Sequence, residues 1–426
     1  MQTASNWDTL IFIVNILGVT LKFALLGIFL YYTIISVFGW FRRKEVPAES
    51  FPIRHTFAII ISAHNEEKVI AGAVRSLKRL NYPSHMYDIF VVADNCKDKT
   101  AECARAEGAN VYERTDTEKR GKGYSLEWMF KNLFKLEKEY DAICILDADN
   151  LVSPNFLMEM NKELSLGHNV VQGYLGSKNP GDSWISGNHS IAYWISNRLF
   201  QLPRHYLGLS CALGGTGFVM TTKVLKEFGW GATCLTEDLE FSLKLVLKGM
   251  RVSWSHDAVV YDEKPLKLSQ SWRQRKRWMQ GHCDCARRYF KDVFLMAIRN
   301  KDKVAFDTAM YLVQPFIIVA NGLWMVVGVI QFIAYCISDF SSIFTLDNLF
   351  YALLIMVLTY YSIVFVFAEG KLSGKIMKYF LAFPLYSITW VPIIIHGFID
   401  RDKREWVHTI HTRSLEITDM EDTNKA

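Results

Sequence analysis

Two aspartates, one residue apart, end an apolar segment in the first half of this 426-residue chain. Ala142–Leu146 (Ala-Ile-Cys-Ile-Leu) is followed by Asp147, Ala148 and Asp149. A buried strand with this sequence would carry both carboxylates to its C-terminal end, where open α/β sheets bind ligands. Two close carboxylates disfavour each other's ionisation, and a hard divalent cation that also binds phosphate would neutralise them. A strand followed by a plain Asp/Asn turn is the alternative interpretation.

The segment is the fourth strand in a region where strand and helix patterns alternate. Strands are expected over residues 56–62, 88–94 and 110–113, and helices after Asn65 and over residues 100–107 and 123–136. Asn65 is the expected N-cap of the first helix, with Glu66 and Glu67 in its first turn. This order predicts a parallel sheet covered by helices, with all strand ends at one crevice. The polar residues expected there are Ser62, His64, Asp94, Asp147 and Asp149.

Two further segments carry charged residues that have a structural and a chemical explanation. The loop Arg120-Gly-Lys122-Gly is a solvated turn or a flexible basic loop that reaches a phosphate or a nucleotide. Thr236-Glu237-Asp238 opens a helix, in which Thr236 is a natural N-cap and the acids suit the helix dipole. The chemical alternative makes Asp238 a general base that faces the crevice.

A basic, aromatic helix is expected from Ser269 to Phe290. Gln274, Arg277 and Trp278 lie at i, i+3 and i+4 and share one face, and an Arg beside a Trp suits a sugar ring near a phosphate. Arg275 and Lys276 are expected to point elsewhere, towards anionic lipid headgroups. An ordinary amphipathic interface helix is the alternative.

Several other kinds of site are disfavoured by the sequence. The glycine fingerprint of dinucleotide-binding proteins is absent after the first strand, and the loop Gly214–Gly217 lacks the lysine of a P-loop. The eight cysteines show no repeated spacing, and His282-Cys-Asp-Cys285 has no second ligand pair, so we expect neither a structural metal site nor disulfides.

The composition indicates a membrane protein with one large water-exposed domain. Hydrophobic residues make up 50% of the chain and aromatic residues 14%, and the net charge is +5. Apolar residues concentrate over 10–41 and from about 308 to 399. The first segment can span a bilayer, and Arg42, Arg43 and Lys44 follow it, which places the N-terminus outside and the next residues in the cytoplasm.

The C-terminal half of the membrane region is expected to cross the bilayer twice and then return. Residues 308–337 and 348–368 are the expected spans. Residues 379–399 form either a third span or a re-entrant hairpin, and the basic residues after them favour a return to the cytoplasm. Trp406, Thr409 and Arg413 would then lie on the catalytic side.

Taken together, these residues resemble the membrane-bound family 2 glycosyltransferases, which include cellulose, chitin, hyaluronan and poly-N-acetylglucosamine synthases. The resemblance covers roughly residues 55–290 well and the membrane part loosely. The matching motifs are Ser62-Ala-His64-Asn65-Glu66-Glu67, Asp94, Arg120-Gly-Lys122, Asp147-Ala-Asp149, Thr236-Glu237-Asp238 and Gln274-x-x-Arg277-Trp278. The resemblance implies a GT-A fold, a Rossmann-like and mostly parallel sheet domain, with flanking transmembrane helices.

The resemblance also implies roles for these residues. The donor would be a nucleotide sugar, usually a UDP-sugar, bound by Ser62, His64, Glu66, Asp94, Lys122 and Asp147. Asp149, with Asp147, would bind Mg²⁺ or Mn²⁺. Asp238 would be the catalytic base, supported by Glu237. The residues that line the diphosphate and acceptor region would be Gln274, Arg277 and Trp278.

The expected domain division follows the composition and the motifs. It comprises an N-terminal transmembrane helix (1–41), a linker (42–55), a cytoplasmic GT-A domain (56–268), amphipathic interface helices (269–305), a C-terminal membrane region (306–400) and a cytoplasmic tail (401–426).

The expected function is inverting transfer of a sugar to a hydroxyl acceptor at the cytoplasmic face of the cell membrane. The product would be a β-linked polysaccharide, and transfer of one sugar to a lipid is the alternative within the same class. A membrane scaffold that only senses a nucleotide sugar is a third interpretation, which the complete set of acids disfavours. The expected partners are the nucleotide sugar, the bilayer and a saccharide or lipid acceptor, with no nucleic acid. The sequence leaves open a homo-oligomer or an accessory membrane subunit.

Overall fold

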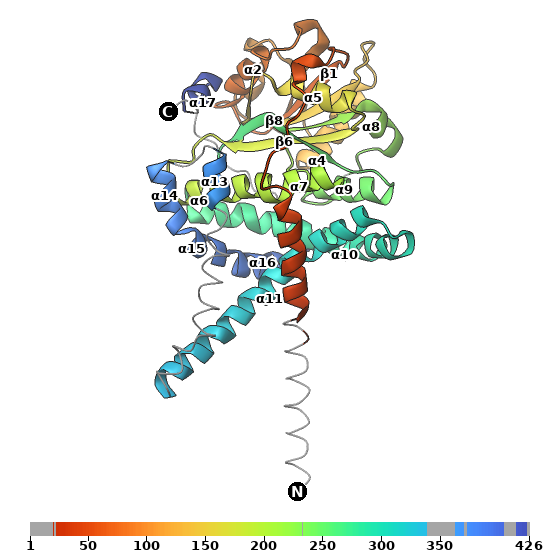
Figure 1. Cartoon of the computed structure of the whole chain (residues 1–426). Coiled ribbons are helices and arrows are strands. Elements are labelled where there is room, and N and C mark those ends of the chain that lie inside the picture. The colour runs from red at the N-terminus through yellow and green to blue at the C-terminus, as the bar shows by residue number, and fades with distance from the viewer. Residues whose placement is uncertain are drawn as a thin grey trace.

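The computed structural model describes residues 20, 23–231, 233–338, 363–369, 373–403 and 415–423. At its centre is an eight-stranded sheet with the order β3-β2-β1-β4-β7-β6-β8-β5 (Figure 1). The strands are β1 (Phe57–Ala63), β2 (Tyr87–Asp94), β3 (Asn110–Arg114), β4 (Ala142–Asp147), β5 (Leu151–Val152), β6 (Val170–Ser177), β7 (Phe218–Thr221) and β8 (Ser253–Asp262).

The sheet is mixed, and only its N-terminal half is the expected parallel βαβαβ unit. β1 pairs in parallel with β2 and β4, and β2 pairs in parallel with β3. β7 runs antiparallel to both β4 and β6, and β5 runs antiparallel to β8. Apolar strand patterns identify a buried strand but carry no information on its direction, so the second half could not be oriented from the sequence.

Both faces of the sheet are buried, which explains the unbroken apolar strands. Alternate residues of β1 point to opposite sides: Ile60 packs in one core cluster, and Ile59 and Ile61 pack in the other. Helices cover each side and supply the rest of these clusters. They are α2 (Ile70–Lys78), α3 (Thr100–Ala106) and α5 (Phe156–Ser165) on one face, and α4 (Lys122–Leu133), α6 (Trp184–Ser196), α8 (Thr222–Phe228) and α9 (Glu237–Leu247) on the other.

A second group of helices lies beneath the sheet domain in Figure 1. Its members are α7 (Leu202–Leu207), α10 (Leu268–Asn300), α11 (Lys303–Ser338), α13 (Ile363–Ala368), α14 (Gly374–Leu381), α15 (Phe383–Ile388) and α16 (Trp390–Ile399). α16 packs closely on α10, because a Cβ on Gly397 would lie only 2.7 Å from Met279 Cβ. A short helix, α17 (Ile417–Thr423), packs separately with Leu151 against the sheet domain.

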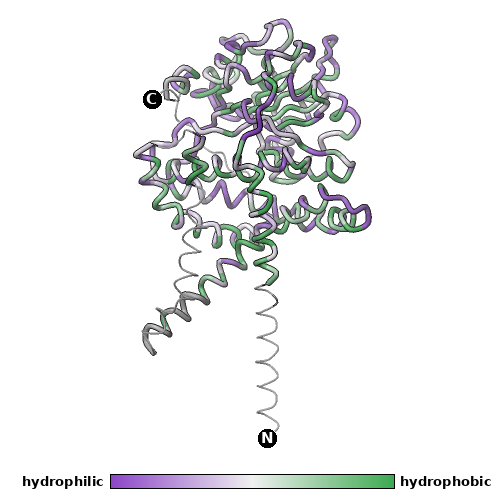
Figure 2. The backbone as a smooth tube through the Cα atoms, viewed as in Figure 1, coloured by the Kyte–Doolittle hydropathy of each residue, from purple (hydrophilic) through white to green (hydrophobic). Residues whose placement is uncertain are grey.

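Apolar helices extend from this base. In the described part of the chain, Lys303–Val326 is long and apolar enough to cross a membrane, and α14 with Phe383–Ile399 passes the same test as a pair bent by 51°. A shorter apolar helix, Phe23–Val37, packs beside α11, where the Tyr31 hydroxyl donates to Asp307 Oδ1 at 2.8 Å. Figure 2 shows apolar residues along these helices.

Part of the expected membrane region lies outside the described residues. This applies to residues 1–19, to most of the expected span 348–368, and to Trp406, Thr409 and Arg413. The domain division therefore stays a prediction.

Candidate active site

The ends of β1 and β4 bring the first polar residues together. In the parallel register of these strands, Ser62 lies opposite Asp147. The Ser62 hydroxyl donates to Ser125 Oγ of α4 at 3.0 Å. The strand-end geometry thus joins residues that are 85 positions apart in the chain.

The β1–α2 loop has a different structure from the one expected. Asn65 is not the N-cap of α2, because that helix begins at Ile70, with Val69 as the N-cap residue. Asn65 has a left-handed backbone (φ 57°), and its Oδ1 accepts a hydrogen bond from Lys97 N at 2.8 Å. Asparagine tolerates this conformation better than most residues. The Asn65 side chain therefore binds the loop after β2 and does not cap a helix.

The same loop positions His64 and Glu66. His64 Nδ1 lies 2.6 Å from the backbone oxygen of Asp94, at the end of the neighbouring strand. Glu66 is buried, and its backbone N–H donates to Thr100 Oγ1 at the start of α3. His64 therefore lies beside Asp94, whereas Glu66 lies on the α3 side of the loop.

Asp94 is held by a partner that the sequence did not reveal. Its Oδ1 accepts hydrogen bonds from Arg114 Nη1 at 2.5 Å and from Asn95 Nδ2 at 3.1 Å. Both partners of the Asp94–Arg114 ion pair are buried, with side chains 8% and 5% exposed. Burial raises the pKa of Asp94, and Arg114 offsets this in part. The strand register explains the contact, because Asp94 and Arg114 are paired positions of β2 and β3.

We expect Arg114→Ala to lower the free energy of unfolding by about 3–5 kcal/mol, because Asp94 would keep a buried charge without its partner. Arg105→Ala is the matched control: Arg105 pairs with Glu113 at the surface, and an exposed pair contributes about 1 kcal/mol or less. Denaturant unfolding of the purified protein in detergent measures both. Equal effects of the two variants would contradict this view of the Asp94 pair.

Lys122, from the basic loop, lies in the crevice. Its ammonium forms an ion pair with Asp147 and also donates to the backbone oxygen of Gly215 at 2.7 Å. Burial lowers the pKa of Lys122, but Asp147 and then Glu237 outweigh this effect and raise it. Lys122 is therefore a paired cation between two acidic segments, whereas Arg120 of the same loop is exposed.

A glycine-rich loop, Gly214–Gly217, closes the other side of the crevice. Gly215 has a left-handed backbone (φ 78°), and a Cβ there would lie 3.3 Å from Asp238 Oδ2. Thr216 Oγ1 accepts from Asp147 N at 3.0 Å. The buried Gln172 side chain holds the loop, accepting from Gly214 N and donating to the Thr216 oxygen, both at 2.9 Å. The loop lacks P-loop chemistry, but it contacts both Lys122 and Asp147.

Glu237 and Asp238 open α9 and face this cation. Thr236 is the N-cap residue, as its position predicted, but its side chain makes no capping hydrogen bond. Asp238 Oδ1 accepts from Leu239 N at 2.7 Å. Burial, followed by the adjacent Glu237 carboxylate, raises the pKa of Asp238 to about 7. A partly exposed carboxylate with such a pKa can take up a proton near neutral pH.

Asp149 lies deeper than Asp147, on the side of β8. It is 5% exposed; its Oδ2 accepts from Glu263 N at 3.0 Å and its Oδ1 from Asn150 Nδ2 at 3.1 Å. Among the described residues, no group of three or more His, Cys, Asp or Glu side chains forms a complete metal site. A carboxylate or two fits Mg²⁺ or Mn²⁺ when substrate phosphates supply the other oxygens, so the donor set suits a metal that arrives with a diphosphate.

Gln274, Arg277 and Trp278 lie within α10 at the i, i+3 and i+4 spacing that puts them on one face of the helix. Arg277 lies close enough to Glu237 to lower the pKa of that carboxyl, which burial raises overall. The Trp278 ring packs against His189 and Tyr193 of α6, with centroid distances of 5.7 and 6.5 Å. Gln274 Oε1 is buried and makes no hydrogen bond with the described residues.

The expectation for Arg275 and Lys276 is wrong. Arg275 is fully buried, donates to Thr389 Oγ1 at 2.9 Å and lies 4.4 Å from the centre of the Tyr386 ring. Lys276 forms an ion pair with Asp400. The C-terminal helices, more than 100 residues away in sequence, cover this face of α10, so Arg275 is buried and the ammonium of Lys276 is paired within the protein.

Comparison with known proteins identifies the family. A sequence model described as "Glycosyltransferase like family 2" matches residues 54–281, just over half of the chain. The chain belongs to this family. It is therefore a family 2 glycosyltransferase, and the resemblance seen in its motifs is confirmed.

Among the curated relatives of this glycosyltransferase, two are named for different products. The probable glycosyltransferase YdaM of Bacillus subtilis is 23% identical over 408 residues, covering 89% of this chain and 93% of the relative. A beta-monoglucosyldiacylglycerol synthase of Trichormus variabilis is 26% identical over 277 residues, 61% of this chain and 56% of the relative. A poly-beta-1,6-N-acetyl-D-glucosamine synthase of Staphylococcus aureus is 24% identical over 265 residues, 59% and 62% respectively. The match thus spans little over half of the last two relatives.

A solved structure supports the fold. The mannosyltransferase PcManGT from Pyrobaculum calidifontis, in complex with GDP-Man and Mn²⁺, superposes with a TM-score of 0.59 at 17% identity, covering 91% of this chain and 98% of that one. The family 2 glycosyltransferase therefore has a GT-A-like α/β fold with a mixed sheet.

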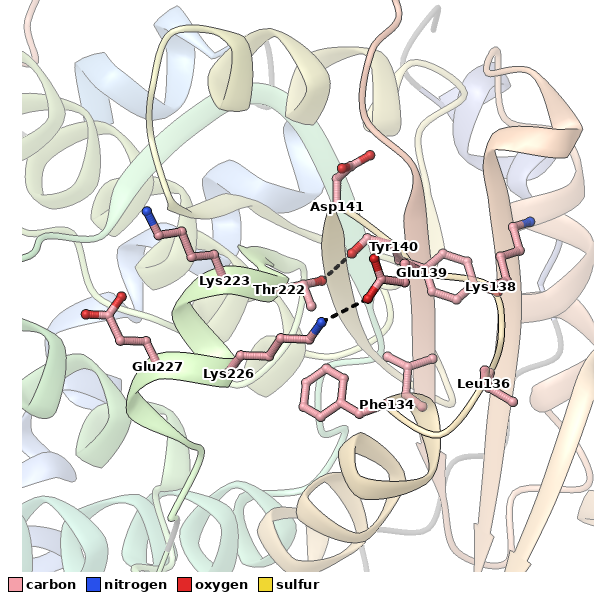
Figure 3. Close-up of a pocket in the computed structure, with 11 residues that line it drawn as sticks. Phe134, Leu136, Lys138, Glu139, Tyr140, Asp141, Thr222, Lys223, Lys226 and Glu227 are labelled. Carbon is pink, nitrogen blue, oxygen red and sulfur yellow. Dashed lines mark hydrogen bonds and ion pairs between the residues drawn. The ribbon is translucent and has the colours of Figure 1, made fainter.

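A cavity of about 570 Å³ lies away from these residues (Figure 3). Tyr140 and Asp141, which precede β4, line it, so it lies at the end of that strand opposite Asp147. Lys226 and Glu139 form an ion pair across it at 3.2 Å. None of the predicted site residues of this glycosyltransferase lines the cavity.

Proposed function

We propose that this glycosyltransferase catalyses inverting transfer of a sugar from a nucleotide-sugar donor, a UDP-sugar, to a hydroxyl acceptor. The observation that carries this proposal is the position of Asp238. Its carboxylate, with a pKa of about 7, lies beside the Gly215 loop and close to Lys122 and Glu237. An acceptor hydroxyl is a poor nucleophile at neutral pH, and a carboxylate poised in this way is the base that it needs.

The other crevice residues suit the leaving group. A nucleoside diphosphate gains negative charge as the glycosidic bond breaks, and fixed cations stabilise that charge. Lys122, held by Asp147 and Gly215, is one such cation, and Arg277 on α10 is the second. Asp149 and Asp147 would hold Mg²⁺ or Mn²⁺, which acts as a Lewis acid on phosphate oxygens when bound. Direct displacement at the anomeric carbon then converts an α-linked donor into a β-glycoside.

The proposed product is a β-linked polysaccharide. The relative named poly-beta-1,6-N-acetyl-D-glucosamine synthase supports a polymer. Gln274, Arg277 and Trp278, which share one face of α10, suit a saccharide acceptor. The second candidate is transfer of one sugar to a lipid. The relative named beta-monoglucosyldiacylglycerol synthase, and the apolar helices beneath the crevice, favour this candidate.

We infer that the protein is a multi-pass protein of the cell membrane with its catalytic domain in the cytoplasm. The helix Lys303–Val326 and the bent pair α14 with Phe383–Ile399 support this inference. Arg42 pairs with Asp257 at 2.6 Å and Arg43 stacks on Tyr206, so the basic residues after the first apolar helix lie against the catalytic domain. Basic residues of this kind mark the cytoplasmic side.

The test is a donor and product assay on membranes that contain the protein. The membranes are incubated with labelled UDP-glucose, UDP-N-acetylglucosamine and GDP-mannose, and products are separated by size and by lipid extraction. We expect label from one UDP-sugar in a high-molecular-weight product that a β-glycosidase degrades. A single lipid-extractable band would select the second candidate, and transfer from GDP-mannose alone would refute the UDP-sugar donor.

A further inference from the structure

A group of buried polar atoms without hydrogen-bond partners lies where α6, α10 and α15 meet. We call these residues the polar cluster: His189, Ser271, Gln274, Arg275 and Tyr386. The unpaired atoms, judged against the described residues, are His189 Nδ1, Ser271 Oγ, Gln274 Oε1, Arg275 Nη2 and the Tyr386 hydroxyl. His189, Ser271, Arg275 and Tyr386 are each at most 2% exposed. Buried polar groups in proteins are nearly always hydrogen-bonded, and an unmade bond costs about 1–3 kcal/mol.

The cluster is continuous in space. The His189 ring lies 5.7 Å from Trp278 and 6.2 Å from Tyr386, measured between ring centroids. Arg275 lies over the same Tyr386 ring at 4.4 Å, and its Nε donates to the Ser271 oxygen. The hydroxyls of Ser271 and Tyr386 are close to each other but outside hydrogen-bond geometry. These side chains therefore form one connected group between the three helices.

Tyr193 connects the polar cluster to the catalytic acids. Its ring lies 5.5 Å from His189, and Lys264 Nζ lies 3.4 Å from its centroid. Burial raises the pKa of Tyr193, and the nearby carboxylates of Asp262 and Asp238 raise it further. Tyr193 is therefore in contact with the polar cluster and within electrostatic reach of the proposed base.

The opposite side of the cluster is apolar. α15 and the helices beside it expose large hydrophobic side chains, including Leu381 (67%), Leu385 (65%) and Ile399 (68%). In Figure 1 α14 lies beside α6, and α15 and α16 lie beneath it. The cluster therefore lies between the catalytic acids and the apolar surface.

The charge state of His189 suits a neutral, hydroxyl-rich ligand. Burial holds the pKa of His189 well below its usual range, and the cations Lys264 and Arg275 lower it further. The neutral ring offers one donor and one acceptor nitrogen. Aromatic faces with a few convergent polar atoms are a typical lining of small-ligand sites.

We propose that His189 and Tyr386 bind the hydroxyl groups of the sugar acceptor, next to Trp278. This inference rests on the proposed function and deepens it. The ligand chemistry is an uncharged group that carries free hydroxyls, which a free oligosaccharide or the glycerol of a diacylglycerol can supply. Gln274 Oε1 and Ser271 Oγ complete the hydrogen bonds to that group, and Trp278 and Tyr193 contact its apolar face.

The test measures acceptor KM in His189→Phe and Tyr386→Phe. Each variant keeps the aromatic contact and removes the polar atom. We expect the acceptor KM to rise about five- to tenfold, the effect of one lost hydrogen bond, while the donor KM serves as internal reference. Tyr379→Phe is the matched control. Tyr379 is on the neighbouring helix α14, and its hydroxyl donates to the backbone oxygen of Gly181 at 3.3 Å. The acceptor KM of this variant should equal that of the native protein.

Two acceptor arms distinguish the source of the hydroxyl groups. One uses a soluble oligosaccharide of glucose or N-acetylglucosamine, and the other uses phosphatidylcholine vesicles that contain diacylglycerol. A KM rise in either arm supports the inference and identifies the source. UDP affinity by calorimetry confirms that each variant is folded. An unchanged acceptor KM in both arms would overturn this inference and leave the proposed function standing. A native protein that consumes no nucleotide sugar would refute the proposed function and, with it, this inference.

Discussion

Replacing Asp238 by asparagine should reduce sugar transfer by about 10²- to 10⁴-fold, the usual contribution of a positioned general base. The amide keeps the shape of the side chain but cannot take the proton of the acceptor hydroxyl. Binding of UDP should persist, because Lys122 and Asp147 are untouched. Initial rates of transfer and calorimetric titration with UDP measure the two properties separately.

The control for this variant is Glu139→Gln, which alters a carboxylate that is 84% exposed at the opposite end of the sheet. It should transfer sugar at the native rate. Normal turnover by Asp238→Asn would remove Asp238 from the mechanism. In the native protein the rate should fall as pH drops through about 7, because the base becomes protonated.

The raised pKa also has a consequence for stability. Asp238 has an ordinary pKa of 3.8 in the unfolded chain and about 7 in the folded protein, so the folded state binds the proton more tightly. The stabilisation that the bound proton gives to the folded state is fully present below pH 3.8 and is lost as pH rises towards 7. The melting temperature of Asp238→Asn should therefore exceed the native value by a margin that grows between these two pH values and then levels.

Asp149→Ala should abolish the part of UDP affinity that depends on a divalent cation, with a loss of tenfold or more when Mn²⁺ is present. The reason is the donor set: Asp149 is the buried carboxylate at the end of β4, fixed by Glu263 N and Asn150. Without metal, the native protein and the variant should bind UDP with the same weak affinity. Transfer should be lost in the variant.

Asp257→Asn controls for the removal of a carboxylate, since Asp257 is on β8 but 46% exposed and pairs with Arg42. It should keep the native response to Mn²⁺. Calorimetry with and without the metal is the measurement. An Asp149 variant that binds UDP equally well in both conditions, with the native affinity, would show that this carboxylate holds no metal.

Much of the parallel half of the fold could be predicted from local patterns. β1, β2 and β4 lie within one or two residues of their expected positions, because continuous apolar segments end there at polar residues. α10 was expected to end at Phe290 and continues to Asn300, since nothing in that stretch breaks a helix. The direction of β7 could not be predicted, because it depends on pairing with β4 across a connection of some 70 residues.

The candidate site divides in the same way. Which residues stand at strand ends and helix starts follows from the chain itself, so the sequence determined Asp147, Asp149 and Asp238 as candidates. The contacts that surround these residues could not be predicted from the sequence. The pairing of Asp94 with Arg114 depends on the register of two strands, and the contact of Gly215 with Asp238 depends on a loop held by Gln172.

The sequence by itself therefore determined the family, the parallel half of the sheet and the chemistry of the strand ends. Tertiary structure decided the protonation and the surroundings of those groups. The burial of Arg275 against Tyr386 of α15, and the raised pKa of Asp238 beside Glu237, are the clearest cases. The physical reason is that patterns along a chain report which side of an element is buried, whereas desolvation and pairing depend on distant segments that pack against it.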